Sequence, residues 1–441
     1  MPSGDNNAKK DKVRELQVTL YLAAKRSPTR RFHALWDRIH RRDVLERAWR
    51  AVRENQGAPG IDRISIAQIE DSGVEPFLAE LQTELREGRY RPRPVRRVYI
   101  PKAGRPGQTR PLGIPTVADR VVQTAAKLVL EPIFEADFRD CSFGFRPKRS
   151  AHDALDAIKG EVMRGRRWVV DADIRGFFDA LRPDTLMALV AERVSDRRVL
   201  KLIRSWLRAG VLDGATLVHP ATGVPQGGGV SPLLANVYLN ALDRAWQERC
   251  RAVGTLIRYA DDLLILCHTK AQAEAALHEL RALLADLGLE LADDKTRVVC
   301  VDEDGEGFDF LGFHHRMIES FRKPGWRYLA RWPSARAMQA ARQRIRELTD
   351  RRRARLPVGV VVADLNRYLT GWGGYFRRGN STRKFHTLDR YVVERLGRLI
   401  GVRHQSSRPI AFGRWWLRQH GYLGLRPLVG RVHRGAAHAA G

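Results

Sequence analysis

Two short apolar segments that carry carboxylates constrain the fold of this chain more than any other feature. The first, RRWVVDADI at 166–174, contains Asp173, and the second, LIRYADDLLILC at 256–267, places Asp261 and Asp262 on a turn between two apolar runs. Because strands hold side chains in fixed directions, we expect the three carboxylates to converge on one small sheet. Converging carboxylates repel one another unless divalent cations neutralise them. The pattern therefore predicts a cation site on a sheet.

Nucleotidyl transfer is the chemistry that such a site suits. Two Mg²⁺ ions about 4 Å apart can activate an attacking 3′-hydroxyl and stabilise a leaving pyrophosphate. The alternative is that the acidic pair forms a solvated turn, and the motif alone does not exclude this. Asp171 lies two residues earlier on the same strand as Asp173, and we interpret it as structural; the alternative is that it shares the face of Asp173.

The positive charge of the chain is concentrated near its C-terminal end. The 441 residues include 78 basic and 50 acidic side chains, a net charge of +28, and 65 of the basic residues are Arg. Residues 316–441 hold 28 basic and 6 acidic side chains, so +22 of the excess lies there. Because Arg grips phosphate oxygens in pairs, this region is predicted to bind a polyanion. A GC-rich genome would explain the ratio of Arg to Lys but not the net excess.

Aromatic residues are interleaved with these arginines. Guanidinium groups that hold phosphates beside rings that stack on unpaired bases are typical of surfaces that bind structured RNA. Trp372 and Tyr375 stand next to glycines, and we interpret them as helix-packing residues instead. The densest basic cluster, a candidate for RNA phosphate contacts, consists of Arg351, Arg352, Arg353 and Arg355. The alternative for this cluster is a solvated helix face.

Hydrophobic periodicity indicates helices mixed with a few short strands, and hence an α+β fold of two or three domains. The segment 95–115 is expected to form a hairpin with a basic tip, and 117–138 and 271–288 are expected to be helices. The region after residue 330 is almost wholly helical in pattern, with predicted breaks at Pro357 and at the GWGG segment 371–374.

Cysteine usage and hydropathy indicate the compartment. The four cysteines lie far apart without a CxxC pair, so neither a disulfide framework nor a cysteine-based zinc site is predicted. No apolar run approaches the roughly 18 residues of a membrane span, and the first residues are polar where a signal peptide would be apolar. We therefore expect a protein of the bacterial cytoplasm with no membrane partner.

Ordered motifs extend the acidic pattern over more than half of the chain. They are IPKAGRPGQTRPLGIP (100–115), SFGFRPKRSAHDAL (142–155), DADIRGFFDAL (171–181), GVPQGGGVSPLLANVYLNALD (223–243), RYADD (258–262), LGLELADDKTRVV (287–299) and FDFLGF (308–313). In this order they resemble the reverse transcriptases encoded within group II introns. The segment LNRYLTGWGGYFRRGN (365–380) is similar to the maturase or thumb domain of the same family.

The resemblance implies a right-hand polymerase with a polar tail and helix at 1–30. Fingers and palm with a small antiparallel sheet would occupy 31–315, an all-helical thumb or maturase domain 316–400, and a basic, candidate DNA-binding extension 401–441. The implied function is RNA-directed DNA polymerisation together with binding of group II intron RNA, assistance to splicing and intron mobility. The implied partners are an RNA template with a DNA primer, deoxynucleotides, target DNA and two Mg²⁺ ions.

The resemblance also implies roles for single residues. Asp173, Asp261 and Asp262 would hold the metal ions, and Lys295 would protonate the departing pyrophosphate. The alternative for Lys295 is a surface ion pair with a neighbouring carboxylate, Asp293 or Asp294.

Four further residues are implied to bind the incoming deoxynucleotide. Lys102 and Arg110 flank the hairpin tip and would hold its β- and γ-phosphates. Phe178 would exclude a ribose 2′-hydroxyl, and Gln226, in a glycine-rich loop, would line the nucleotide pocket. The alternative for Phe178 is a core residue, as Phe177 is expected to be.

Two other functions are open to a chain with these motifs, one with polymerase activity and one without it. A domesticated relative in DNA repair or phage defence would keep the polymerase without an intron, and a splicing-only maturase would bind RNA without copying it. The sequence after Cys300 has no cysteine and no ligand spacing among its histidines, so we expect the form of the family that lacks an HNH endonuclease. DNA opening would then depend on a nick or a replication fork.

Overall fold

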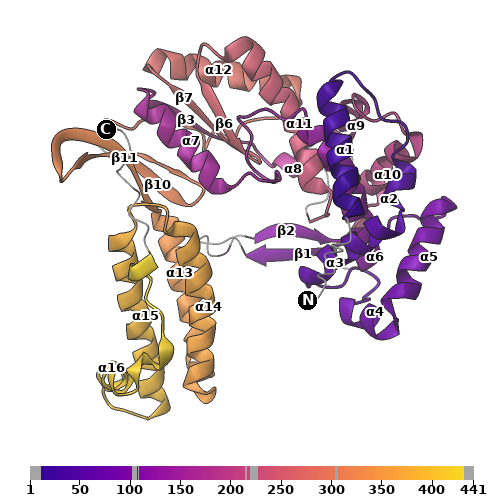
Figure 1. Ribbon diagram of the computed structural model, residues 1–441. Helices are drawn as coiled ribbons and strands as arrows, with labels where there is room; N and C mark the ends of the chain where they lie inside the picture. The colour runs from indigo at the N-terminus through magenta and orange to yellow at the C-terminus, as the bar shows by residue number, and fades with distance from the viewer. Residues whose placement is uncertain are drawn as a thin grey trace, which may run out of the picture. The chain divides into compact units, whose positions relative to one another are not determined.

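The computed structural model describes residues 11–101, 107, 109–213, 216–218, 227–302 and 306–431. The chain divides into two compact units. The first comprises Met1–Ile100, Thr109–Ala154 and Val170–Val298, and the second Pro101–Gln108, Leu155–Val169 and Val299–Gly441. Helices and short strands occur in both, which confirms the α+β class (Figure 1). The domain limits expected at residues 30, 315 and 400 stay predictions.

The helical core of the first unit is built around α6 (Val117–Glu135). Thr116 caps its start by accepting a hydrogen bond from the backbone N–H of Asp119 at 3.0 Å. Apolar residues on most of its circumference are buried, so it packs against both α1 (Lys12–Arg26) and α3 (Arg42–Glu54). Each buried Val or Leu of this kind contributes about 1.5–3 kcal/mol. The predicted helix at 117–138 is confirmed.

Further helices lie between residues 36 and 286. In addition to α3 and α6 they are α2 (Trp36–Ile39), α4 (Ile66–Ser72), α5 (Val74–Arg86), α7 (Ala151–Met163), α8 (Phe177–Ala180), α9 (Pro183–Ala191), α10 (Arg197–Arg208), α11 (Ser231–Ala245), continued by the π-helix η1 (Trp246–Cys250), and α12 (Lys270–Asp286). The range of α12 confirms the helix expected at 271–288. Eleven of the 15 residues of α11 are buried, which makes it a second interior helix.

Two four-stranded sheets lie in the first 300 residues. The strands of one follow the order β2 (Thr109–Ile114), β1 (Val95–Pro101), β4 (Val211–Asp213), β5 (Thr216–Val218). Those of the other follow the order β6 (Thr255–Tyr259), β7 (Asp262–Cys267), β3 (Trp168–Asp173), β8 (Arg297–Cys300). The adjacent β1 and β2 confirm the hairpin predicted at 95–115. The second sheet carries the acidic motifs.

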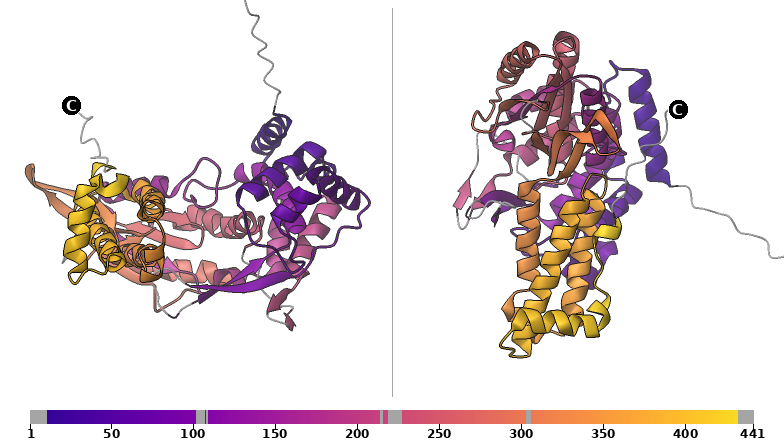
Figure 2. Two further views of the ribbon diagram at one scale, coloured as in Figure 1. Left: turned by 90° about the horizontal axis from the view of Figure 1, so that it is seen from below. Right: turned by 90° about the vertical axis from the view of Figure 1, so that its left-hand side faces the viewer.

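The second unit combines a twisted sheet with a helical bundle. Its sheet is antiparallel: β10 (Phe313–Ser320) pairs with both β9 (Phe308–Phe310) and β11 (Lys323–Pro333). The helices are α13 (Ala335–Leu348), the 3₁₀ turn η2 (Arg351–Arg355), α14 (Val358–Phe376), α15 (Thr382–Arg403), α16 (Pro409–Gln419), and the 3₁₀ turns η3 (Gly421–Gly424) and η4 (Val429–Arg431). Figures 1 and 2 show α13, α14 and α15 side by side.

The β10–β11 hairpin occupies 313–333, and the helices that follow it begin at Ala335, in agreement with the helical pattern after residue 330. The structure differs from one expectation in this unit. The predicted break at 371–374 is wrong, since α14 runs through this segment to Phe376. Trp372 and Tyr375 flank the buried Gly373, and the packing of their rings against Phe376 outweighs the low helix propensity of glycine. The break at Pro357 is confirmed, because Pro357 immediately precedes α14.

None of the helices in the described ranges combines the length and the apolar character that crossing a lipid bilayer requires.

Candidate active site

The sheet β6-β7-β3-β8 brings the three predicted carboxylates of the first unit together. Asp173 is the last residue of β3, next to β7 in the sheet. In the β6–β7 hairpin Tyr259 pairs with Asp262, which leaves Ala260 and Asp261 as the turn. Ala260 has a left-handed backbone with φ of 58°. The tight turn therefore carries Asp261, and β7 begins directly after it at Asp262.

Burial, together with the negative charges nearby, raises the pKa values of Asp261 and Asp262. Burial raises the pKa of Asp261, and the charge of Asp173 adds to the effect. The pKa of Asp262 is raised to about 7, first because protein packs closely around its carboxyl group and then because of the charges of Asp261, Asp173 and Asp171. The side chain of Asp262 nevertheless keeps access to solvent. Like charges in a partly desolvated place favour a protonated group or a bound cation.

Lys295 lies within this group of carboxylates. Its Nζ donates to Oδ2 of Asp173, and the backbone N–H of Ala292 donates to the Asp173 carbonyl at 2.8 Å. Lys295 therefore pairs with Asp173, whereas Asp293, one of the surface partners considered, accepts from Arg281 at 2.7 Å. Asp171 accepts from Arg297 at 3.2 Å, in keeping with a structural role.

Carboxylate oxygens are the donors that Mg²⁺ prefers, so the residue types fit a divalent metal. Their placement is less complete, because the described ranges contain no three His, Cys, Asp or Glu side chains arranged to hold one ion. Lys295 occupies an oxygen of Asp173 that a metal would need. Mg²⁺ would therefore have to displace the ammonium group or share Asp173 with it.

The residues expected to bind a nucleotide are only partly described. Phe177 is buried, whereas Phe178 is half-exposed and meets the ring of Phe177 edge-on at 5.2 Å. This division agrees with a core role for Phe177 and leaves the ring of Phe178 accessible. Arg110 is exposed near the start of β2. Lys102 and Gln226 lie outside the described residues.

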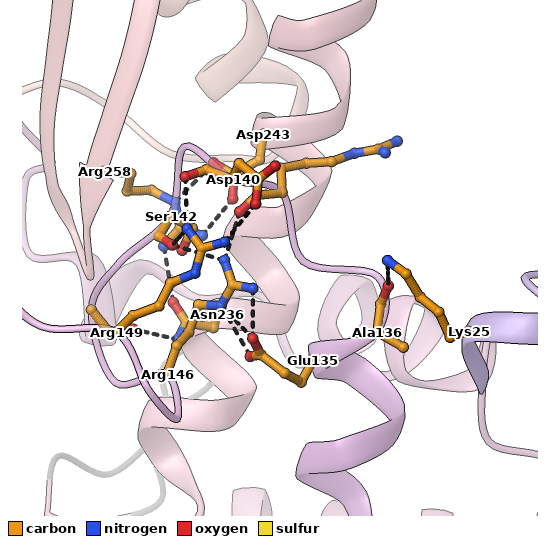
Figure 3. Close-up of polar contacts among 12 residues, drawn as sticks. Lys25, Glu135, Ala136, Asp140, Ser142, Arg146, Arg149, Asn236, Asp243 and Arg258 are labelled. Carbon is orange, nitrogen blue, oxygen red and sulfur yellow. Dashed lines mark hydrogen bonds and ion pairs between the residues drawn. The ribbon is translucent and has the colours of Figure 1, made fainter. Parts of the chain in front are cut away.

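Behind the Asp261 turn lies a buried polar network that the sequence motifs did not identify (Figure 3). Arg258 of β6 and Asp243 of α11 are both fully buried, with Arg258 Nε 2.8 Å from Asp243 Oδ1. Arg258 also donates to the carbonyl of Ala260 at 2.9 Å and to Oδ1 of Asn236 at 2.9 Å. A basic residue inside an apolar strand was the available signal, but its partner is on a separate helix.

The basic cluster in the second unit lies on η2. Arg351, Arg352 and Arg355 are exposed, whereas Arg353 is half-buried and 2.5 Å from Oδ2 of Asp364 on α14. Arg353 also donates to the carbonyl of Leu348 at 3.1 Å, at the end of α13. Three of the four guanidinium groups therefore face solvent, and the fourth fastens the turn to two helices.

Two family models match this chain. Residues 100–315 match "Reverse transcriptase (RNA-dependent DNA polymerase)". Residues 338–421 match "Group II intron, maturase-specific domain". The first range contains every carboxylate of the candidate site, and the second contains η2 and the helices around it.

Curated proteins from bacteria and a yeast are similar to the chain. Protein YkfC of Escherichia coli (strain K12) is 37% identical over 353 residues, which cover 71% of this chain and 90% of that protein. Group II intron-encoded protein LtrA of Lactococcus lactis subsp. cremoris is 40% identical over 215 residues, which cover 48% of this chain and 35% of LtrA. An uncharacterized 91 kDa protein in the cob intron of Schizosaccharomyces pombe is 35% identical over 209 residues, or 47% of this chain and 25% of that protein. The chain thus spans most of YkfC and about a third of LtrA.

A solved chain of a partial Cas6-RT-Cas1–Cas2 complex is also similar, with 26% identity and a TM-score of 0.36 over 57% of this chain and 42% of that chain.

Proposed function

We propose that this chain copies RNA with a two-metal site and assists intron splicing with a separate basic surface. The chain belongs to the family of group II intron reverse transcriptases and maturases, and it is an RNA-directed DNA polymerase. The observation that carries the polymerase site is the meeting of Asp173, Asp261 and Asp262 beside Lys295. These groups lie within the range that matches the reverse transcriptase model.

In this proposal the carboxylates hold the metal ions through their oxygens. Bound Mg²⁺ would supply charge stabilisation for the attacking and leaving oxygens of an in-line displacement. Asp173, at the end of a strand, and Asp261, on a tight hairpin turn, hold their oxygens in fixed directions. Asp262 adds negative charge and keeps contact with solvent.

Lys295 and Phe178 have different parts in the same reaction. The Nζ of Lys295 holds a proton next to Asp173 and can pass it to a departing pyrophosphate, as a general acid requires. The accessible ring of Phe178 would collide with a 2′-hydroxyl and so select deoxynucleotides. Arg110 is exposed and free to approach a triphosphate, and Lys102 and Gln226 are proposed to complete the nucleotide pocket.

Intron RNA binding is proposed for the second unit. The exposed guanidinium groups of η2, within the range that matches the maturase-specific domain, support this assignment. Arg forms bidentate contacts with phosphate, and a large basic surface stabilises folded RNA by mass action without chemistry on it. Intron mobility, with synthesis of DNA at a target site, would then use both surfaces.

The test separates the two activities. In the double variant Asp261→Ala, Asp262→Ala, two carboxylates are lost and the basic region is unchanged, so DNA synthesis should stop while splicing of the cognate intron at low Mg²⁺ persists. The matched control, Asp293→Ala with Asp294→Ala, removes two exposed carboxylates and should keep both activities. Purified proteins would be added to intron RNA transcribed from the DNA flanking the gene, and ligated exons and primer extension would be followed over time.

Two outcomes would overturn parts of the proposal. If the double variant binds RNA normally but cannot support splicing, the two activities do not use separate sites. If the wild-type protein copies RNA but never accelerates splicing, a polymerase without an intron, in DNA repair or phage defence, becomes the better function.

A further inference from the structure

One arginine interrupts the apolar sequence of β6, and the structure buries it completely. Arg258 has no exposed surface, and neither has Asp243, which faces it from α11 with a closest N–O separation of 2.5 Å. Taking two charges out of water is unfavourable, and a buried pair can often be replaced by apolar residues without loss of stability. A role in stability alone is therefore a weak explanation for this pair.

The guanidinium group makes two contacts besides the ion pair, one with the turn between β6 and β7 and one with α11. Its Nη1 donates to the carbonyl of Ala260 at 2.9 Å and to Oδ1 of Asn236 at 2.9 Å. Ala260 has φ of 58°, a left-handed conformation that is unfavourable for a residue with a Cβ atom. The hydrogen bond from Arg258 therefore holds the carbonyl of Ala260, the residue of the turn with the unfavourable backbone conformation.

The segment 141–144 also packs against the turn. The backbone N–H of Arg258 donates to Cys141 at 2.7 Å, and that of Phe143 donates to the Arg258 carbonyl at 2.9 Å. Gly144 follows directly, and a Cβ atom there would lie 2.4 Å from the backbone N of Ala260. The segment therefore touches the turn so closely that only glycine fits at this position.

Asn236 joins the two supports. Its Nδ2 donates to the carbonyl of Gly144 at 2.8 Å, while its Oδ1 accepts from Arg258. Figure 3 shows Asp243, Arg258 and Asn236 close together. The contacts continue from Asn236 to Gly144, and both Arg258 and Gly144 lie against Ala260.

We propose that Arg258, oriented by Asp243 and Asn236, is the positioning residue that fixes the Ala260–Asp261 turn and thereby the direction of the Asp261 carboxylate. The inference rests on the proposed polymerase role of Asp261. Because Arg258 is fully buried, it acts through the backbone of the turn and not by contact with substrate. Its charge also lies behind Asp261 and opposes the repulsion among the carboxylates.

Arg258→Lys is the test variant, because lysine keeps the charge next to Asp243 but cannot donate in three directions with fixed geometry. We expect the amides of 259–262 to exchange with deuterium at least 10-fold faster. We expect kcat for primer extension to fall about 10- to 100-fold, as it does when a reacting group is misplaced by about 1 Å, while KM for deoxynucleotide and primer-template affinity change less than threefold. Arg193→Lys is the matched control: Arg193 is buried, pairs with Asp137 at 3.1 Å and makes no contact with the turn. It should leave exchange at 259–262 and kcat unchanged.

Asn236→Ala serves as a second variant that keeps the ion pair, and it should show the same effects more weakly if Arg258→Lys does not fold. Unchanged exchange at 259–262 in a folded variant would overturn the proposal whatever the activity. Faster exchange with unchanged kcat would also overturn it, because the turn would then not need to be fixed. If wild type shows no polymerisation at all, the proposed function fails, and the exchange measurement still decides whether Arg258 holds the turn.

Discussion

The carboxylate site and the basic turn η2 hold their charges in opposite ways. Asp173 accepts a hydrogen bond from Lys295, and the fully buried Arg258 donates one to the turn that carries Asp261. In η2, by contrast, the guanidinium groups of Arg351, Arg352 and Arg355 project into solvent from a single 3₁₀ turn. Chemistry on a phosphodiester needs atoms at fixed positions, whereas attraction of a polyanion depends mainly on the number of cations.

This difference predicts that single substitutions have large effects in the first region and small ones in the second. The largest effect is expected for Lys295→Met. If Lys295 is the general acid, loss of its proton should lower kcat about 10²- to 10⁴-fold with little change in primer-template affinity. Single-turnover primer extension measures this. Lys270→Met is the control, since Lys270 is exposed at the start of α12, where it pairs with the exposed Glu274. A kcat within threefold of wild type for Lys295→Met would reduce Lys295 to a structural partner of Asp173.

The loss of stability on breaking an ion pair should likewise be large behind the carboxylate site, where the pair is buried, and small on α13, where the pair is exposed. Asp243→Asn leaves Arg258 buried without a counter-charge, so the free energy of unfolding should fall by about 3–5 kcal/mol. Glu347→Gln breaks an exposed pair with Arg344 on α13 and should cost no more than about 1 kcal/mol. Urea unfolding followed by tryptophan fluorescence compares them. Equal losses would show that burial does not distinguish these pairs.

Phe178 tests whether a half-exposed ring next to the site has a function of its own. Phe178→Val should raise incorporation of ribonucleotides relative to deoxynucleotides about 10- to 200-fold, since removal of a steric contact is worth about 1–3 kcal/mol. The ratio of kcat/KM values for the two nucleotides measures the effect. Phe177→Leu changes the buried neighbour and should lower stability without changing the ratio. If both variants keep the wild-type ratio, Phe178 is a packing residue.

Much of the site could be predicted from sequence because local patterns determine it. Apolar runs on both sides of an acidic pair specify a hairpin, so the sequence predicts that Asp261 lies in its turn and that Asp262 begins the next strand. The likeness of the ordered motifs to one family added the fold, and the comparisons confirm it. The partner of Lys295 was not predictable, because Asp173 is 122 positions away.

The parts that sequence analysis missed depend on long-range packing. Arg258 could be recognised as unusual in an apolar strand, but Asn236 and Asp243 become its partners only when α11 packs beside the sheet. The GWGG segment was expected to break a helix, and ring packing around Phe376 keeps it helical. Arg353 looked equivalent to its neighbours, and its contact with Asp364 depends on how η2 folds against α14.

The smallest effects are expected in η2. Replacing Arg351, Arg352 and Arg355 together with Gln should flatten the plot of log K for RNA against log salt by roughly 2 to 3 units, since each neutralised phosphate contributes about 0.7–0.9. Affinity at low salt should fall, while primer extension at saturating template stays near wild type. Filter binding over a range of salt concentrations measures the slope.

Arg353→Gln is the control that uses the contrast inside the cluster itself. Arg353 is held by Asp364 and by the end of α13, so its loss should lower the stability of the helical region by about 1 kcal/mol, as for a partly exposed pair. The salt slope should stay within about 0.3 units of wild type because no phosphate contact is lost. The change in slope caused by Arg353→Gln can be compared with one third of the change caused by the triple variant. If the two are equal, the ion pair between Arg353 and Asp364 opens on RNA binding, and all four arginines belong to the RNA surface. If the triple variant leaves the slope unchanged, η2 is a solvated face and the RNA contacts lie elsewhere in the basic region.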